Sequence, residues 1–205
     1  MKTNQLYFIA LACALLLQGC SSTSHPLGKP APGQASSSAE MERLLDQPGP
    51  VQLETINSAD WSVSLAGLLN LDSPAAKQAG LKERDEPIQV YAHVLKHPKF
   101  GNFLVDTGVS QKLLDDPGKV GVNWLIQKVM HIEKMHINKS TAEILQGLDG
   151  KLSGVLFTHL HLDHISGMPD IPDDAPLYIG ATESSATSFK NMFARGANNQ
   201  TRVQI

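Results

Sequence analysis

The feature that most constrains this chain is a short apolar run leading directly into a cluster of histidine and aspartate. The run GVLFT, residues 154–158, has the length and composition of a buried strand. His159, His161, Asp163 and His164 follow it within six positions. Imidazole nitrogens and carboxylate oxygens both bind zinc, at about 2.0–2.2 Å. We therefore predict a metal site at the carboxyl end of a buried strand, where α/β sheets usually carry their function.

The spacing within the cluster favours two metal centres. His159 and His161 are two positions apart in extended backbone, so their side chains can turn toward one centre. Asp163 and His164 come at the next turn and can serve a second one. Two metals about 3.5–4 Å apart can together polarise a carbonyl or phosphoryl group. The remaining histidines of the globular part match no site, and we interpret them as structural or solvated: His93, His97, His131 and His136.

The elements before the cluster read as a β-hairpin followed by helices. Residues 87–97 place apolar side chains on one face with period two, and FLVDTG at 103–108 is a second strand ending in Gly108. The helical spacing of apolar residues predicts one helix within 121–135. A capping box beginning at Ser140, with Gly147 as the stop, predicts another. Beyond the cluster we expect a strand at 177–180, a helix over 181–193 and the start of a further strand at the end.

These segments resemble the metallo-β-lactamase superfamily through the loop THLHLDH and the strand FLVDTG. The resemblance extends more loosely from about residue 50 to the end. It implies an α/β fold, the αββα sandwich of that family, and a zinc-dependent hydrolase with two zinc ions in the complete enzyme. Manganese or iron also suits histidine and carboxylate ligands. In such an enzyme a metal-bound hydroxide attacks a lactone or ester carbonyl of a small-molecule substrate.

The resemblance also assigns roles to individual residues. His159 and His161 would bind the first metal, and Asp163 and His164 the second. Asp163 would in addition pass a proton to the leaving group, which makes it the candidate catalytic residue. Asp106 would be hydrogen-bonded behind the metal loop and fix its orientation. An equally good interpretation of Asp106 is a turn residue that caps the bend after its strand.

The chain contains only part of the family's site. No histidine follows His164, and the later aspartates Asp170, Asp173 and Asp174 lie in a proline-rich loop typical of surface turns. We therefore expect only the first half of the sandwich, as the N-terminal portion of a longer enzyme. Lactone or ester hydrolysis, as in the lactonase-like branch, is the leading interpretation; β-lactam and phosphodiester substrates are alternatives. The alternative to an enzyme is a catalytically incomplete fragment, or a non-enzymatic metal-binding or interaction module.

The N-terminal region reads as a targeting segment and a linker. Residues 1–19 have the length of a signal peptide, and Leu17-Gln18-Gly19-Cys20 resembles a bacterial lipobox, which implies lipid on Cys20. An ordinary signal cut after Ala14 is the alternative. Residues 20–48 are rich in Ser, Pro and Gly near their start, which indicates a flexible tether. Residues 49–205 are expected to form the metallo-β-lactamase-like domain, incomplete at its C-terminal end. We expect a lipid-anchored protein of the bacterial envelope, at the outer membrane and facing the periplasm.

Composition limits the remaining classes of function. Cys13 and Cys20 are the only cysteines, so thiolates cannot supply a zinc site in the globular part. The chain has 17 basic and 20 acidic residues, and removing residues 1–19 takes away one lysine and no acid. This balance does not indicate nucleic-acid binding. The expected partners are a small-molecule substrate and, through Cys20, a membrane.

Overall fold

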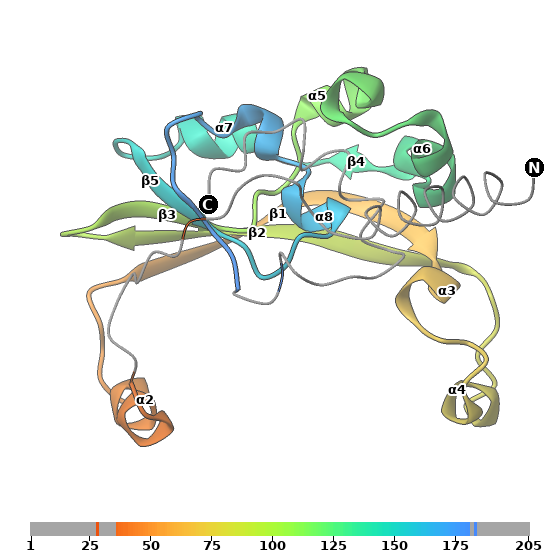
Figure 1. Cartoon of the computed structure of the whole chain (residues 1–205), viewed down its shortest axis with the longest axis horizontal. Helices are drawn as coiled ribbons and strands as arrows, with labels where there is room; N and C mark the ends of the chain where they lie inside the picture. The colour runs from red at the N-terminus through yellow and green to blue at the C-terminus, as the bar shows by residue number, and fades with distance from the viewer. Residues whose placement is uncertain (1–27, 29–35, 181–182, 184–205) are drawn as a thin grey trace, which may run out of the picture.

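A six-stranded mixed sheet forms the centre of the molecule (Figure 1). The computed structural model describes residues 28, 36–180 and 183 of the 205-residue chain. The strand order is β4-β1-β2-β3-β5-β6; β4, β1, β2 and β3 pair antiparallel, whereas β3, β5 and β6 pair parallel. The strands are β1 (Gln52–Ser64), β2 (Asp85–His97), β3 (Gly101–Val105), β4 (His136–Ile137), β5 (Leu152–Leu156) and β6 (Leu177–Tyr178).

Short helices flank this sheet. Helices α5 to α8 lie on one face, while α2 and α4 project on the other side (Figure 1). Among the described residues, no helix is long and apolar enough to cross a membrane. The α-helices are α2 (Ser38–Leu45), α3 (Leu65–Leu68), α4 (Pro74–Gln78), α5 (Gln111–Asp115), α6 (Trp124–Met130), α7 (Thr141–Gln146) and α8 (Leu162–Ile165). The 3-10 helices are η2 (Pro117–Val120), η3 (Ile132–Lys134) and η4 (Met168–Asp170).

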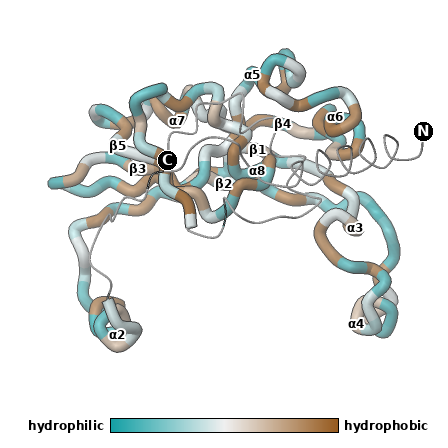
Figure 2. Tube along the Cα trace, in the orientation of Figure 1, coloured by the Kyte–Doolittle hydropathy of each residue, from teal (hydrophilic) through white to brown (hydrophobic). Residues whose placement is uncertain are grey.

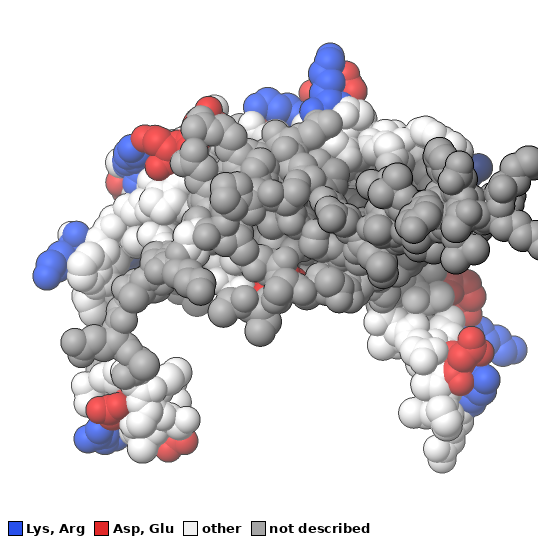
Figure 3. Space-filling model, viewed as in Figure 1, with Lys and Arg blue, Asp and Glu red and all other residues white. Residues whose placement is uncertain are grey.

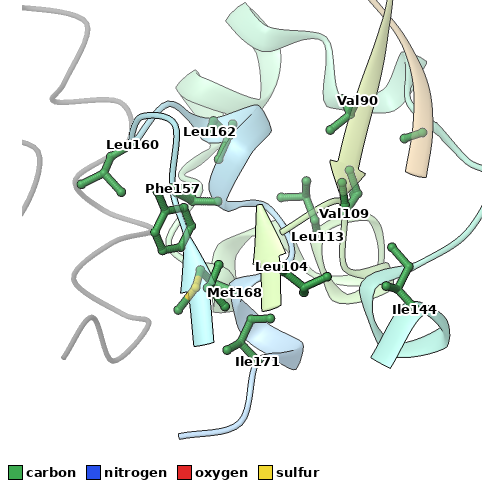
Figure 4. Packing of buried hydrophobic residues seen from close by; sticks show 14 of the residues in the cluster. Val90, Leu104, Val109, Leu113, Ile144, Phe157, Leu160, Leu162, Met168 and Ile171 are labelled. Carbon is green, nitrogen blue, oxygen red and sulfur yellow. The ribbon is translucent and has the colours of Figure 1, made fainter. Parts of the chain in front are cut away.

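The predicted hairpin and the buried strand are confirmed. β2 and β3 pair antiparallel across the turn before Gly101, and Val90, Ala92 and Val94 are buried on one face of β2. β5 coincides with most of the apolar run at 154–158 and lies between β3 and β6. The core therefore forms under the helix-covered face, where side chains from β3, the metal loop and α7 meet (Figure 4).

The helix predicted within 121–135 is shorter than expected. Asn123 caps α6 by accepting from the backbone N–H groups of Leu125 and Ile126. His131 adopts a left-handed conformation with φ 51° and ends the helix after two turns. Ile126 is the one side chain of α6 that is buried, so the apolar stripe predicted from helical spacing does not pack as one face. Local capping overrides the periodic pattern here.

Two further helices differ in how well the sequence indicates them. α7 begins at the predicted capping box, with the Ser140 and Glu143 side chains each bonded to the other's backbone, and ends at Gly147. α2 carries a similar box at Ser37 and Glu40 inside residues 20–48, where no helix is expected; it contributes no buried side chain. The helix expected over 181–193 and the final strand lie outside the described residues.

Candidate metal centre

The loop after β5 turns its histidines away from the core because its leucines fill it. Leu160 and Leu162 are 1% and 4% exposed and pack in the hydrophobic core (Figure 4). Extended backbone sends successive side chains to opposite sides. His159 and His161 therefore face away from the packed leucines, and α8 begins directly after His161. Alternation of leucine with histidine in the sequence thus fixes which side chains reach the surface.

Asp106 lies behind this loop at the end of β3. Because β3 and β5 are parallel neighbours, their carboxyl ends lie at the same edge of the sheet. Asp106 has φ 55°, and its buried carboxylate accepts from the Thr158 N–H at 2.9 Å and from the Thr158 hydroxyl at 2.8 Å. Both features expected of Asp106 occur together: its backbone makes the bend, and its carboxylate reaches the metal loop.

His164 lies between two carboxylates. Its Nδ1 is 2.8 Å from Asp106 Oδ2, and its Nε2 is 3.3 Å from Asp163 Oδ2. Burial lowers the pKa of His164, but hydrogen bonds to both carboxylates outweigh this and raise the pKa to about 9. Burial likewise raises the pKa values of Asp106 and Asp163, and their hydrogen bonds, with His164 first, bring both below the ordinary range. The three groups form a charged unit at neutral pH.

The three loop histidines are gathered in one place. The His159 ring centroid is 4.5 Å from that of His161 and 3.9 Å from that of His164. Burial lowers the pKa of His159, and repulsion from the two neighbouring histidines lowers it further. The Thr158 hydroxyl lies 3.2 Å from His159 Nδ1 and 3.1 Å from His164 Nδ1, so Thr158 connects the cluster to Asp106.

The chemistry of these side chains suits zinc, whereas their arrangement is a hydrogen-bonded one. Three imidazoles and one carboxylate are ligand types that zinc takes. Within the part of the chain that the structure describes, however, no three His, Cys, Asp or Glu side chains are placed to hold one ion. Both ring nitrogens of His164 contact carboxylates, Nδ1 that of Asp106 and Nε2 that of Asp163. The donor set therefore fits a metal by type and location, and His164 must exchange its contact with Asp163 to serve as a ligand.

A buried set of hydrogen bonds, which we call the clamp, joins Thr107, Thr141 and Gly167 and holds the backbone of the metal loop in place. Thr107 N–H and Thr107 Oγ1 both donate to the His164 carbonyl, at 3.0 and 2.8 Å, and Thr107 Oγ1 accepts from the Gly167 N–H at 2.9 Å. Thr141, the first residue of α7, donates to the Thr107 carbonyl at 2.7 Å. These residues and Thr158 are functional positions that the sequence alone did not predict. No local signal marks them, because their hydrogen bonds join positions far apart in the chain.

The other residues considered from sequence lie apart from the cluster. His93 hydrogen-bonds Thr55 on the neighbouring strand β1, His97 accepts from the turn after β2, and His131 contacts Glu133. Two of the later aspartates pair with lysines: Asp170 lies 2.9 Å from Lys112, and Asp174 contacts Lys151. Cys20 lies outside the described residues.

Residues 85–191 match the family model described as the metallo-beta-lactamase superfamily. The chain belongs to this superfamily. The match covers just over half of the chain and includes both Asp106 and the metal loop. The mixed sheet with helices on one face is accordingly a metallo-β-lactamase-like α/β fold. The superfamily is one of metal-dependent hydrolases, and the chain shares its fold.

Several solved structures are similar to this chain at low sequence identity. A probable metal-dependent hydrolase from Staphylococcus aureus is 15% identical, with a TM-score of 0.48, over 77% of this chain and 58% of that one. A Bacillus thuringiensis protein with N-decanoyl-L-homoserine at its active site is 18% identical, with a TM-score of 0.46, over 72% and 57%. An N-acyl homoserine lactone hydrolase is 18% identical, with a TM-score of 0.43, over 72% and 57%. The chain thus spans under two thirds of their lengths. No curated protein sequence matches it.

The charged unit around His164 predicts how stability of the metal-free protein depends on pH. The pKa of His164 rises from 6.5 to about 9, so its contribution is complete below pH 6.5 and is lost as the pH rises through 9. The pKa of Asp106 is lowered from 3.8, so its contribution is present above that pH and is lost in stronger acid. Because 27% of the His164 side chain is exposed, we expect a loss on the order of 1–2 kcal/mol between pH 6.5 and 9.5.

Urea unfolding with a chelator present, at pH 6.5 and at pH 9.5, measures this difference. A His164→Gln variant is the control, since it should lose most of the difference between the two conditions. Equal stability of the unsubstituted protein at the two pH values would contradict the assignment of His164 as the titrating group.

Proposed function

We propose that this chain carries the metal-binding half of a metal-dependent hydrolase that acts on lactones or esters. One observation carries the proposal: in a member of the metallo-β-lactamase superfamily, four side chains of metal-binding type gather at the carboxyl end of β5. These are His159, His161, Asp163 and His164. The Asp106 carboxylate hydrogen-bonds to His164 and so fixes the orientation of its ring. The solved hydrolases and lactonase with related folds give the reaction class that we test first.

The residues divide between holding the metal and orienting its ligands. His159 and His161 would hold a first zinc ion, and Asp163 and His164 a second. When bound, zinc makes water more acidic and polarises a carbonyl group. Asp106 keeps Nδ1 of His164 protonated, so that Nε2 is the nitrogen left for a ligand bond. The Asp163 carboxylate, which contacts His164 and is partly exposed, would receive a proton and deliver it to a leaving oxygen.

Hydrolysis of a neutral lactone by the zinc-loaded full chain tests the proposal. We expect activity that a chelator abolishes and that His159→Ala lowers at least about 100-fold. His136→Ala is the matched control, because His136 is exposed in β4 and lies outside the cluster. Activity that survives His159→Ala would show that the loop is not the reactive site.

A second candidate is a non-catalytic module that binds metal weakly or docks a partner. The observation in its favour is that, among the described residues, no three ligands are placed around one ion. Zinc bound to the cluster without lactone, ester, β-lactam or phosphodiester hydrolysis would support this candidate over the enzyme.

We also propose that residues 1–19 direct the chain to the bacterial envelope and that Cys20 carries lipid, which would hold the domain at the outer membrane. The support is the apolar run ending in Leu17-Gln18-Gly19-Cys20. Incorporation of labelled palmitate into the wild-type chain but not into Cys20→Ser is the expected result. Equal labelling of both proteins would contradict it.

A further inference from the structure

One end of the sheet lies next to the N-terminal linker in the chain. β1 starts at this end, because Gln52 is the register partner of Lys96 near the end of β2. The turn at 98–100 joins β2 to β3 at the same end, and α2 projects from it (Figure 1). We call α2, residues 51–53 and residues 96–100 the linker end. The metal loop follows β5 at the opposite end of β3 and β5, about 17 Å away along the five residues of β3.

The helix of the linker end exposes a stripe of large apolar side chains. Met41, Leu44 and Leu45 follow the helical spacing i, i+3, i+4 and share one face, and Leu45 is 83% exposed. Figure 2 shows hydrophobic residues along α2 beside hydrophilic ones. None of its side chains is buried. A helix this short is marginal in water by itself, and packing of an apolar face supplies most of a helix's stability in proteins. The exposed face of α2 therefore suits an apolar surface that lies outside the described residues.

The β2–β3 turn presents an aromatic ring at the same end. Phe100 is 59% exposed, and its ring centroid lies 4.5 Å from that of His97. His97 Nδ1 accepts from the backbone N–H groups of Lys99 and Phe100, at 3.0 and 3.2 Å, which fixes the turn. Val51 and Leu53, at the start of β1, are also exposed. Apolar side chains from three segments thus gather at the linker end.

Lysines beside these apolar side chains indicate which kind of surface the linker end fits. Lys96 and Lys99 flank the turn, and Lys99 Nζ is 5.3 Å from the centre of the Phe100 ring. Figure 3 shows basic side chains without acidic neighbours at the left edge of the face it draws, where this turn lies in Figure 1. Lysine is depleted at the centre of protein–protein interfaces. Leucine, aromatic rings and lysine together are typical of segments that lie at the surface of a bilayer.

The linker connects this end of the molecule to the expected lipid. Residues 21–37 join Cys20 to α2. For the flexible linker that their composition predicts, this length gives an average span of about 20–25 Å. A lipid on Cys20 would therefore keep α2 and the β2–β3 turn close to the bilayer, at a high effective concentration.

We propose that the linker end lies on the phospholipid surface that holds Cys20, with the apolar stripe of α2 and the Phe100 ring among the head groups. The inference rests on the lipid anchor proposed for Cys20 and does not depend on metal binding or hydrolysis. Because the metal loop lies at the opposite end of β3 and β5, this contact would turn the loop away from the membrane and toward water.

Quenching of tryptophan emission by brominated phospholipids provides the test, because bromine quenches only at short range. Trp61 and Trp124 are the only tryptophans, and they are 3% and 74% exposed. Trp124→Phe combined with Phe100→Trp moves the exposed emitter to the turn and gives the probe protein; the unsubstituted protein is its control. Both are full chains purified with their lipid and placed in vesicles of brominated phosphatidylcholine and phosphatidylglycerol. We expect the probe protein to lose about a third or more of its emission and the control less than about a tenth.

Two pairs of substitutions in the probe protein locate the contact on α2. Leu44→Asp with Leu45→Asp places charge on the exposed stripe, and we expect the quenching to fall by about half or more. The stripe buries no side chain, so the fold should be unaffected. Leu68→Asp with Leu69→Asp is the matched control, at exposed leucines that follow the other end of β1, and should leave the quenching unchanged.

Three results would overturn the inference: no quenching of the probe protein, equal quenching of the probe protein and the unsubstituted control, or quenching that survives the two substitutions in α2. Palmitate labelling of the same preparations separates the contact from the anchor. A labelled chain without quenching overturns the contact alone, whereas an unlabelled chain overturns both. Zinc content and hydrolysis play no part in this readout, so its failure and failure of the proposed hydrolase remain distinct.

Discussion

Asp106→Asn is expected to lower the free energy of unfolding of the metal-free protein by about 2–4 kcal/mol. Asparagine tolerates the positive φ of this position, so the change removes the charge and keeps the bend. The buried carboxylate accepts three hydrogen bonds, two from Thr158 and one from His164. Without it, the partly buried imidazolium of His164 retains only Asp163 as a counter-charge.

Urea unfolding at pH 6.5 with a chelator measures this loss, and Asp116→Asn is the matched control. Asp116 caps η2 and pairs with Lys119 at the surface, so asparagine should cost less than about 1 kcal/mol there. If Asp106→Asn were no more destabilising than Asp116→Asn, Asp106 would be an ordinary turn residue, and the bracing of the metal loop would have to come from elsewhere.

The second large effect is expected for Gly167→Ala. A Cβ at this position would lie 2.1 Å from Thr141 Oγ1 and 2.4 Å from the Thr107 carbonyl oxygen. These two atoms form the hydrogen bond that joins α7 to the turn after β3. Neither atom can withdraw without breaking that bond or shifting the backbone under His164. We expect a loss of about 3 kcal/mol or more in the free energy of unfolding, at the upper end of overpacking effects.

Two further variants test the cause of that loss. Gly49→Ala should stay within about 0.5 kcal/mol of the unsubstituted protein, because no atom lies within 4 Å of a Cβ built there. Gly167→Ala combined with Thr141→Ala should recover little, because the backbone oxygen of Thr107 still blocks the Cβ. A stability within 1 kcal/mol of wild type for Gly167→Ala alone would contradict the close approach of the two segments.

Local sequence signals predicted the elements that depend on local interactions. The hairpin followed from alternation along β2, and α7 followed from its capping box at Ser140. α6 was predicted too long because helical spacing cannot show that His131 turns left-handed and that its carbonyl accepts from Trp61. α2 was missed although it carries the same kind of capping box at Ser37 and Glu40, because the Ser-, Pro- and Gly-rich composition before it predicts a tether; none of its side chains is buried.

The candidate site was predictable in its residues but not in their contacts. Histidine and aspartate spacing located the loop, since crowding of metal-binding side chains is visible in any sequence. The clamp formed by Thr107, Thr141 and Gly167 joins positions far apart in the chain, and nothing local distinguishes these residues from others of their type. Ser58 is a similar case. It sits at the bulge of β1, donates to the Lys139 carbonyl and accepts from the Val109 N–H.

Zinc binding by the purified full chain tests the central claim, that residues 159–164 form the metal site, most directly. Equilibrium dialysis followed by metal analysis compares the unsubstituted protein with His161→Ala and with the control His136→Ala. We predict that the unsubstituted protein and the control retain zinc and that His161→Ala loses most of it, because the loop imidazoles are the ligands. Zinc content unchanged by His161→Ala, or no zinc bound by the unsubstituted chain, would contradict the account.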